Sequence, residues 1–172
     1  MKKGTRGFSL IELLIVVAII LIIAAIAIPN LLRSRIAANQ ASAVGSLRTL
    51  NTAEVTYSTT YNVGYSSTLA DLGPPAAGGS PTASFAGLID EVLSGIGTAG
   101  GTATTLNTSQ KSGYQFVYSP GSTTAPVTTY SFTASPISPG TTGTNYYFTD
   151  QSGVIRQNST TTASSTDSPL AG

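Results

Sequence analysis

Few side chains in this sequence could do chemistry. The chain has no histidine and no cysteine, so the commonest general base and the thiolate metal ligands are both absent. Asp90 and Glu91 are adjacent, and on a helix they would point about 100° apart, which makes a poor acid/base pair. Lys111 lies near Ser109 and Ser112, but a lysine in a Ser-rich loop is expected by accident. We therefore expect no enzyme, no catalytic residue, no metal and no cofactor.

Three polar positions carry weaker signals. Asp150 precedes a Gly-containing turn and is better explained as a turn-forming residue than as a calcium ligand. Asn107 and Asn158 each begin a three-residue pattern for N-glycosylation, which has little weight in so Thr-rich a chain. None of these patterns indicates a catalytic site.

One carboxylate, that of Glu12, lies in an apolar segment where an ionised group is energetically unfavourable. Glu12 lies near the start of an apolar run from Phe8 to Ile28, which as a helix would be roughly 31 Å long and could cross a bilayer. An ionised side chain inside lipid costs several kcal/mol. Lys2, Lys3 and Arg6 precede the run, so we expect the N-terminus to stay cytoplasmic and the remainder to be exported.

Three interpretations of this segment compete. It could be a permanent signal anchor, or a signal peptide cut at the small-residue site Ala25-Ile26-Ala27. Alternatively, a peptidase could cut between Gly7 and Phe8. The new amine at Phe8 and the carboxylate of Glu12 are each costly in lipid, but they could neutralise each other when subunits pack side by side. Glu12 would then serve assembly.

The stretch Gly7-Phe8-Ser9-Leu10-Ile11-Glu12-Leu13-Leu14 resembles the N-terminus of type IV pilins and type II secretion pseudopilins. The basic leader before it and Pro29 after the apolar run belong to the same resemblance. The resemblance implies cleavage between Gly7 and Phe8 by a prepilin peptidase and N-methylation of Phe8. It also implies that Glu12 pairs with the Phe8 amine of a neighbouring subunit.

The resemblance further implies a structural subunit of a type IV pilus, with a homo-oligomeric helical filament as its assembled form. Its partners would be the prepilin peptidase, the pilus assembly platform, minor pilins and, before assembly, the inner membrane. The filament would lie at the cell surface. A type II secretion pseudopilin remains an alternative, although we find no Asp- and Gly-rich calcium loop. A membrane-anchored monomeric binding domain is another. Many type IV pilins have a cysteine-bracketed loop near the C-terminus. This chain has no cysteine, so the resemblance does not predict how its last strand is held in place.

Composition fits an exported domain with a weakly charged surface. Charged residues make up 9% of the chain, against roughly 25% in an average soluble domain. Loss of residues 1–7 would remove Lys2, Lys3 and Arg6 and change the formal net charge from +1 to −2. The positive net charge of the full chain therefore comes from the leader. Without that charge on the remaining chain, no nucleic-acid site is expected.

Beyond Pro29 the pattern becomes amphipathic. One stripe of residues at helical spacing follows: Ile36, Ala43, Leu47, Leu50, Tyr57 and Tyr61. Glu54 interrupts this stripe as its one polar member. We expect a single helix from about Phe8 to Tyr61, with a kink or locally unwound stretch at Pro29. A helix boundary at Pro29 is the alternative.

The remaining chain predicts a small sheet, so the fold class is α+β with a long N-terminal helix packed on an antiparallel meander, pilin-like by resemblance. The expected strands are 114–118, 127–134 and 146–149, with 154–156 completing a hairpin. Residues 83–93 are expected to form a short helix. The predicted segments are the leader 1–7, transmembrane half-helix 8–29, amphipathic half-helix 30–61, connecting region 62–113, meander 114–156 and a mobile Ser/Thr-rich tail 157–172.

Overall fold

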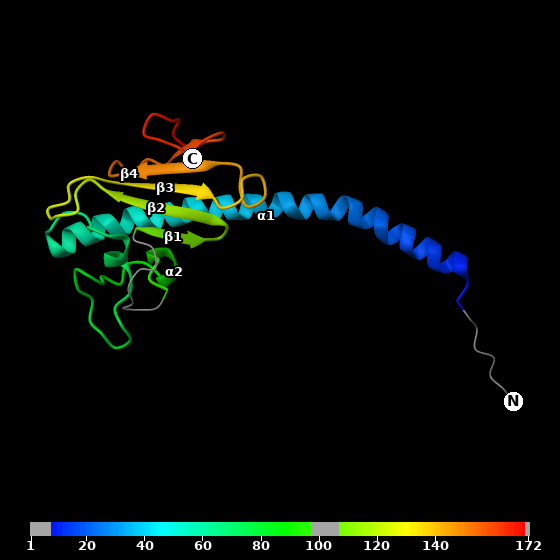
Figure 1. Cartoon of the computed structure of the whole chain (residues 1–172), viewed down its shortest axis with the longest axis horizontal. Helices are drawn as coiled ribbons and strands as arrows, with labels where there is room; N and C mark the ends of the chain where they lie inside the picture. Colours follow the sequence, from blue (N-terminus) through cyan, green and yellow to red (C-terminus); the bar gives the residue numbers. More distant parts are fainter. Residues whose placement is uncertain (1–7, 98–106, 171–172) are drawn as a thin grey trace. The chain divides into compact units, whose positions relative to one another are not determined.

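The computed structural model describes residues 8–97 and 107–170. The chain divides into two compact units, Met1–Arg35 and Ile36–Gly172. Figure 1 shows the elements in chain order. They are α1 (Leu10–Tyr61), the 3₁₀ helix η1 (Leu69–Leu72), α2 (Glu91–Ser94), β1 (Thr108–Lys111), β2 (Tyr114–Pro120), β3 (Tyr130–Pro136), β4 (Tyr146–Asp150) and β5 (Arg156–Asn158).

The first unit contains the N-terminal part of α1. The helix starts at Leu10, two residues after the expected position, and continues without a break through Pro29 to Tyr61. A helix boundary or an unwound stretch at Pro29 is therefore not found, whereas a kink there stays a prediction. Length and composition would allow α1 to cross a membrane, a test that signal sequences also pass.

The second unit contains a five-stranded antiparallel sheet. Its spatial order β1-β2-β3-β4-β5 is the chain order, so the expected meander is confirmed. The 7-residue strands β2 and β3 pair over their whole length, from Tyr114 opposite Pro136 to Pro120 opposite Tyr130. Together with α1 this sheet gives the expected α+β fold.

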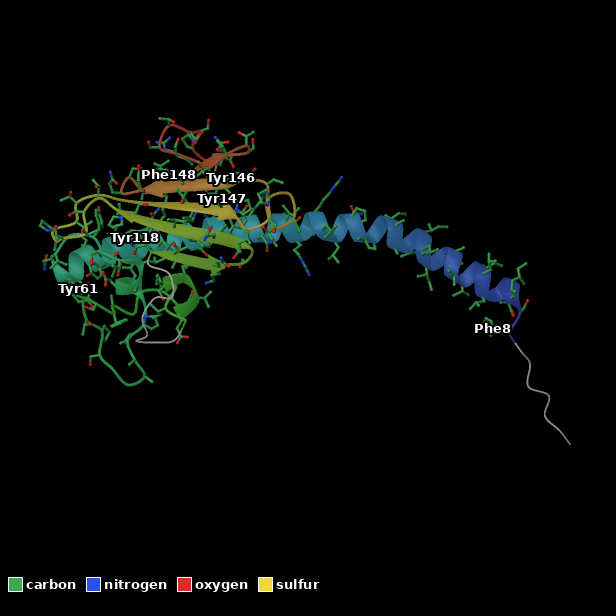
Figure 2. The ribbon with its side chains drawn as sticks, in the orientation of Figure 1. Phe8, Tyr61, Tyr118, Tyr146, Tyr147 and Phe148 are labelled. Atoms are coloured by element: carbon green, nitrogen blue, oxygen red, sulfur yellow. The ribbon has the colours of Figure 1, made fainter. Side chains whose placement is uncertain are left out.

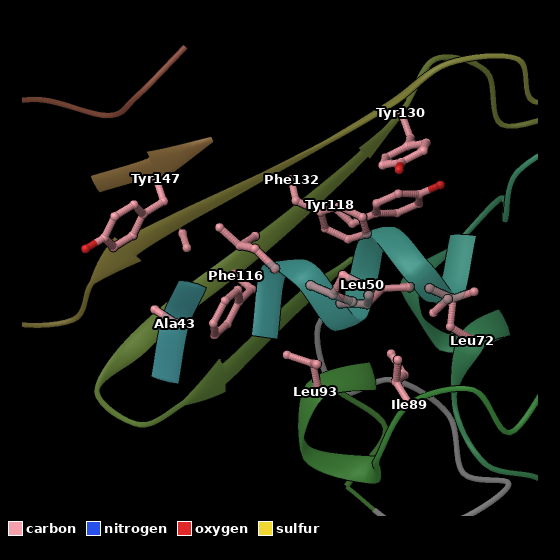
Figure 3. Close-up of a cluster of buried hydrophobic side chains, with 14 of the residues drawn as sticks. Ala43, Leu50, Leu72, Ile89, Leu93, Phe116, Tyr118, Tyr130, Phe132 and Tyr147 are labelled. Carbon is pink, nitrogen blue, oxygen red and sulfur yellow. The ribbon is translucent and has the colours of Figure 1, made fainter. Parts of the chain in front are cut away.

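The core lies between one face of the sheet and the later turns of α1 (Figure 3). Alternate residues of β2 and β3 are buried, which is the pattern of a sheet with one covered face. The helix contributes Ala43, Leu47 and Leu50, each 0% exposed. The predicted stripe is thus confirmed as core, with Ile36 and Tyr61 partly buried at its ends.

The predicted helix at 83–93 is wrong over most of its length. Only Glu91–Ser94 is helical, and the Asp90 carboxylate caps it by accepting a hydrogen bond from the Leu93 N–H at 2.9 Å. Gly87 has φ +67°, a left-handed conformation that does not continue a right-handed helix. The N–H groups of Ala86 and Leu88 instead donate to the carbonyls of Asp71 and Leu72 in η1.

The strand boundaries also differ from the expectation. β3 begins at Tyr130, because the Val127 carbonyl accepts a hydrogen bond from Tyr65 N–H at 2.8 Å rather than joining the ladder. β1 has no counterpart among the expected strands, and it adds an edge strand paired with β2. The final hairpin is confirmed, although β5 starts only at Arg156.

The Ser/Thr-rich tail is folded back on β5 over its described part, in contrast to the mobility expected from its composition. Gln157 N–H donates to the Ser168 carbonyl at 3.0 Å, and Leu170 N–H donates to the Ile155 carbonyl at 2.8 Å. Ala163 is 3% exposed. These hydrogen bonds fasten the last strand in a chain without disulfides.

Candidate processing and assembly segment

The predicted processing site lies at the beginning of the described chain. Phe8 lies at the N-terminal end of α1, separated from it by Ser9 (Figure 2). Its side chain is 78% exposed. Gly7 and the basic leader lie outside the described residues. Cleavage between Gly7 and Phe8 and methylation of Phe8 therefore remain predictions.

Glu12 caps its own helix. Ser9 is the N-cap residue, since its carbonyl accepts the first helical hydrogen bond from Leu13 N–H at 3.2 Å. The Glu12 Oε2 atom accepts a hydrogen bond from Ser9 N–H at 2.9 Å. This is the Glu half of a capping box, and the Ser-x-x-Glu spacing in the sequence could have predicted it.

The cap is compatible with the assembly role that the sequence predicts for Glu12. A carboxylate has two oxygens and about four lone-pair sites, so a group that accepts one backbone hydrogen bond can also accept from a charged amine. The cap also holds the carboxylate at the N-terminus of α1, where the helix dipole favours negative charge. The geometry thus keeps Glu12 close to the segment that contains Phe8.

The apolar run has no covered face. Its large hydrophobic side chains are between 47% exposed, at Val17, and 79% exposed, at Leu10. A helix that is hydrophobic all round belongs in a protein core or in a membrane. Nothing in the described part of the first unit covers this surface.

Two of the residues considered for catalysis, Lys111 and Asp90, pair with each other. Lys111 Nζ lies 2.6 Å from Asp90 Oδ2, an ion pair that connects β1 to the cap of α2. Partial burial acts to raise the pKa of Asp90, but hydrogen bonds from Lys111 and from the Leu93 N–H outweigh it and lower that pKa. Lys111 is therefore engaged by a carboxylate rather than placed to activate a serine.

The three weaker polar signals are turn and loop contacts. Asp150 Oδ1 accepts hydrogen bonds from the backbone and the hydroxyl of Ser152, which confirms it as a turn-forming residue. Asn107 Oδ1 accepts from Leu69 N–H, and Asn158 Nδ2 donates to Asp167 Oδ1, each at 2.9 Å. Within residues 8–97 and 107–170, no group of three or more acidic, histidine or cysteine side chains could hold a metal ion.

Comparison with known proteins agrees with this N-terminal geometry. Residues 2–28 match the family described as "Prokaryotic N-terminal methylation motif". The chain carries the N-terminal motif of a type IV prepilin. The resemblance seen in the sequence is therefore confirmed, and the exposed Phe8, the capped Glu12 and the apolar helix all belong to the prepilin motif.

Two curated relatives are similar to part of this chain. The Type IV major pilin protein PilA of Myxococcus xanthus is 52% identical over 52 residues, which are 30% of this chain and 24% of that protein. The Type IV wide pilus major component PilA4 of Thermus thermophilus is 62% identical over 37 residues, which are 22% of this chain and 28% of that protein.

The matched part therefore spans about a quarter of the length of either relative. No solved structure gives a significant match to the chain.

Proposed function

We propose that this protein is a structural, non-enzymatic subunit of a type IV pilus filament. The observation that supports the proposal most directly is the prepilin segment, in which an apolar helix exposed on all sides carries a capped carboxylate near its start. Such a helix needs a surrounding apolar environment. Lipid supplies it before assembly, and the helices of other subunits supply it in a filament.

In this proposal the precursor is held in the inner membrane with its basic leader in the cytoplasm. A prepilin peptidase cuts between Gly7 and Phe8, and the new N-terminus is methylated. The assembly platform and minor pilins then take part in moving the subunit into a filament at the cell surface. The relatives described as major components of pili support the last step, in which the subunit becomes part of a filament.

Glu12 is proposed to select and orient the incoming subunit. Its carboxylate would neutralise the Phe8 amine of a neighbouring subunit while its Oε2 atom keeps the cap on Ser9 N–H. The Glu12 carboxylate and the Phe8 amine would then move from lipid into the filament as a neutral pair. Because charge-assisted hydrogen bonds are the stronger ones, this pairing fits a recognition contact within an otherwise uniform apolar surface.

The test compares Glu12→Leu with Glu12→Gln in the cells that make the pilus. Both variants remove the charge, but a Gln oxygen can still accept the hydrogen bond from Ser9 N–H. We expect both to yield a correctly cut inner-membrane protein, with surface filaments abolished. Filaments of normal number with Glu12→Gln would show that the cap, not the charge pair, serves assembly.

The mass and N-terminal sequence of the mature chain test the processing step. A methylated Phe8 at the N-terminus is expected, whereas an intact Met1 or a start at Ile28 would contradict the proposal and favour an anchored domain or a secreted one. Deleting the gene distinguishes a pilus from a secretion pseudopilus. Loss of surface filaments supports the first, and loss of enzyme secretion with filaments intact supports the second.

A further inference from the structure

Glu54 is a buried acid for which the proposed function has no use. Of the described residues it is the one acidic side chain that is 0% exposed, and it lies on the core face of α1. It forms no ion pair with any cation in the described part of the chain. An ionised carboxylate in such a place is costly unless other groups compensate for its lost hydration.

Its contacts join three parts of the second unit. Glu54 Oε2 accepts a hydrogen bond from Ser66 N–H at 2.9 Å, and Glu54 Oε1 lies 2.7 Å from Ser66 Oγ. The same Ser66 Oγ lies 3.2 Å from the Tyr118 hydroxyl, which donates to the Ser66 carbonyl at 2.6 Å. Helix α1, the connection after it and strand β2 therefore meet at Ser66.

Counting the available hydrogens indicates which protonation state of Glu54 fits these contacts best. Three oxygen-to-oxygen contacts run from Glu54 Oε1 through Ser66 Oγ and the Tyr118 hydroxyl to the Ser66 carbonyl, and each needs one hydrogen. The Tyr118 hydrogen goes to the carbonyl, which has none of its own. The Ser66 hydroxyl has one hydrogen for its two contacts. The third hydrogen is available only from a neutral Glu54.

When Glu54 is neutral, its carboxyl donates to Ser66 Oγ, Ser66 Oγ donates to Tyr118, and Tyr118 donates to the Ser66 carbonyl. When Glu54 is ionised, the Ser66 hydroxyl must choose between the carboxylate and Tyr118. One contact is then lost, and a charge is left in the core. The arrangement is complete only with the proton in place.

We propose that Glu54, Ser66 and Tyr118 form a proton-dependent latch that holds the connection 62–68 against α1 and β2. With Glu54 neutral the latch is closed. Loss of the Glu54 proton weakens it and lets the connection open locally. This proposal is independent of whether the chain forms a pilus.

The surroundings place this change near neutral pH. Burial raises the pKa of Glu54 from 4.5 to about 7, and the negative charge of Asp71 adds to the increase. The hydrogen bonds that an ionised carboxylate would accept from Ser66 and Tyr118 act in the opposite direction, but burial outweighs them. Besides Tyr118 of the cluster on β2, Tyr57 on α1 and Tyr130 on β3 interact with Glu54. Burial, with nearby negative charge, raises the pKa of all three, so these phenols stay neutral when Glu54 titrates.

The connection has other attachments, so the expected opening is local. Tyr65 N–H donates to the Val127 carbonyl at 2.8 Å, and the Tyr65 and Tyr130 ring centroids are 4.6 Å apart. Asp71 Oδ2 accepts from the N–H groups of Ser67 and Thr68. These contacts do not involve the Glu54 carboxyl, and Asp71 therefore supplies the matched control.

The experiment measures amide hydrogen-exchange protection of residues 62–68 in the full chain in detergent micelles, from pH 5 to pH 8. For the unchanged protein, the opening constant should rise on the order of 10²-fold across this range, since each pKa unit is a factor of ten. Glu54→Gln keeps a donor and an acceptor but cannot titrate, so its protection factors should not change with pH.

Asp71→Asn removes the neighbouring charge and should keep the pH dependence while lowering its midpoint. An unchanged pH dependence in Glu54→Gln, or protection in the original chain that does not vary with pH, would overturn the proposal.

An infrared titration covers the case in which Glu54→Gln fails to fold. It uses the Glu12→Gln chain, so that the carboxylate of the apolar segment does not contribute. A neutral carboxylic acid band should persist at pH 6, where ordinary Asp and Glu side chains are ionised, and it should disappear around pH 7. A spectrum with no such band at pH 6 would show that Glu54 is ionised and that the latch does not exist.

Discussion

The two parts of α1 contain similar residues in opposite surroundings. In the first unit the large apolar side chains are 47% exposed or more, whereas Ala43, Leu47 and Leu50 of the second unit are 0% exposed. The second unit folds a sheet over its part of the helix, and the described residues of the first supply no such cover. One part therefore contributes to the core of a folded domain, whereas the other leaves its apolar side chains uncovered by the described residues of its own unit.

This difference predicts that the two kinds of substitution have separable effects. Changes after Ile36 should alter the free energy of unfolding, because they remove contacts within the chain. In the proposed pilus subunit, changes before Arg35 should alter membrane insertion and assembly, because their contacts would be made with lipid or other subunits. Four changes to the chain or its solvent test this separation, in order of decreasing effect.

The largest effect is expected from removing the apolar part of the helix. A chain that begins at Asn30 should be soluble, monomeric and cooperatively folded, and it should be unable to polymerise at all. Exposed hydrophobic area costs about 25 cal/mol per Å², so its removal takes away the main drive for association. Sedimentation and a thermal melt would test this. Aggregation, or a spectrum without a transition, would contradict the division of the helix near Pro29.

A matched pair of leucines gives the next largest effect. Leu47→Ala should lower the free energy of unfolding by about 2–5 kcal/mol, because it leaves a cavity in the core under the sheet. Leu14→Ala, in a side chain that is 60% exposed, should leave this value unchanged within error. Urea unfolding of both full-length variants in detergent micelles measures the difference. Equal losses would mean that the first unit has intramolecular contacts after all.

The third effect is a dependence of stability on pH. The folded domain holds the Glu54 proton more tightly than the unfolded chain, since burial raises the pKa from 4.5 to about 7. The stabilisation is therefore fully present below pH 4.5 and is lost as the pH rises to about 7, a change of about 3 kcal/mol at most. Denaturation midpoints at several pH values would measure it. Stability that rises across this range would contradict the assignment.

The smallest effect is expected at the ion pair between β1 and α2. Lys111→Met removes the contact with Asp90, whose side chain is 50% exposed, and exposed pairs contribute about 0–1 kcal/mol. The Asp90 cap on α2 is untouched by this change. Unfolding at low and high salt would test it, with the original chain and the variant converging at high salt. A loss near that of Leu47→Ala would show that the pair is far better shielded than its exposure indicates.

The sequence predicted those parts of the fold whose burial follows a simple period. The stripe of α1 and the alternation in β2 and β3 both bury apolar side chains at regular spacing, and both are confirmed. β1 is the polar run Thr108–Lys111, which has no such signal. The 83–93 segment has helical spacing of apolar residues, but hydrogen bonds to η1 and the conformation of Gly87 override it.

The same distinction applies to the polar residues. Glu12 is conspicuous as a carboxylate in an apolar run, and its cap was predictable from the spacing to Ser9. Glu54 is recognisable as the polar interruption of the stripe. Its partners are not, because Ser66 lies 12 residues from Glu54 and 52 residues from Tyr118, and nothing in a Ser-rich sequence marks one serine as different.

The order of the strands has a consequence for how an exported chain acquires its structure. Each strand pairs with the one made just before it, and none has to be inserted between two strands that are already in place. A chain that crosses a membrane with its N-terminus retained could therefore add strands to the sheet one at a time, onto a helix that is already present. Local pairing of this kind keeps loop closure short and favours fast folding. With no cysteine in the chain, no oxidation step has to be completed before the last strand docks.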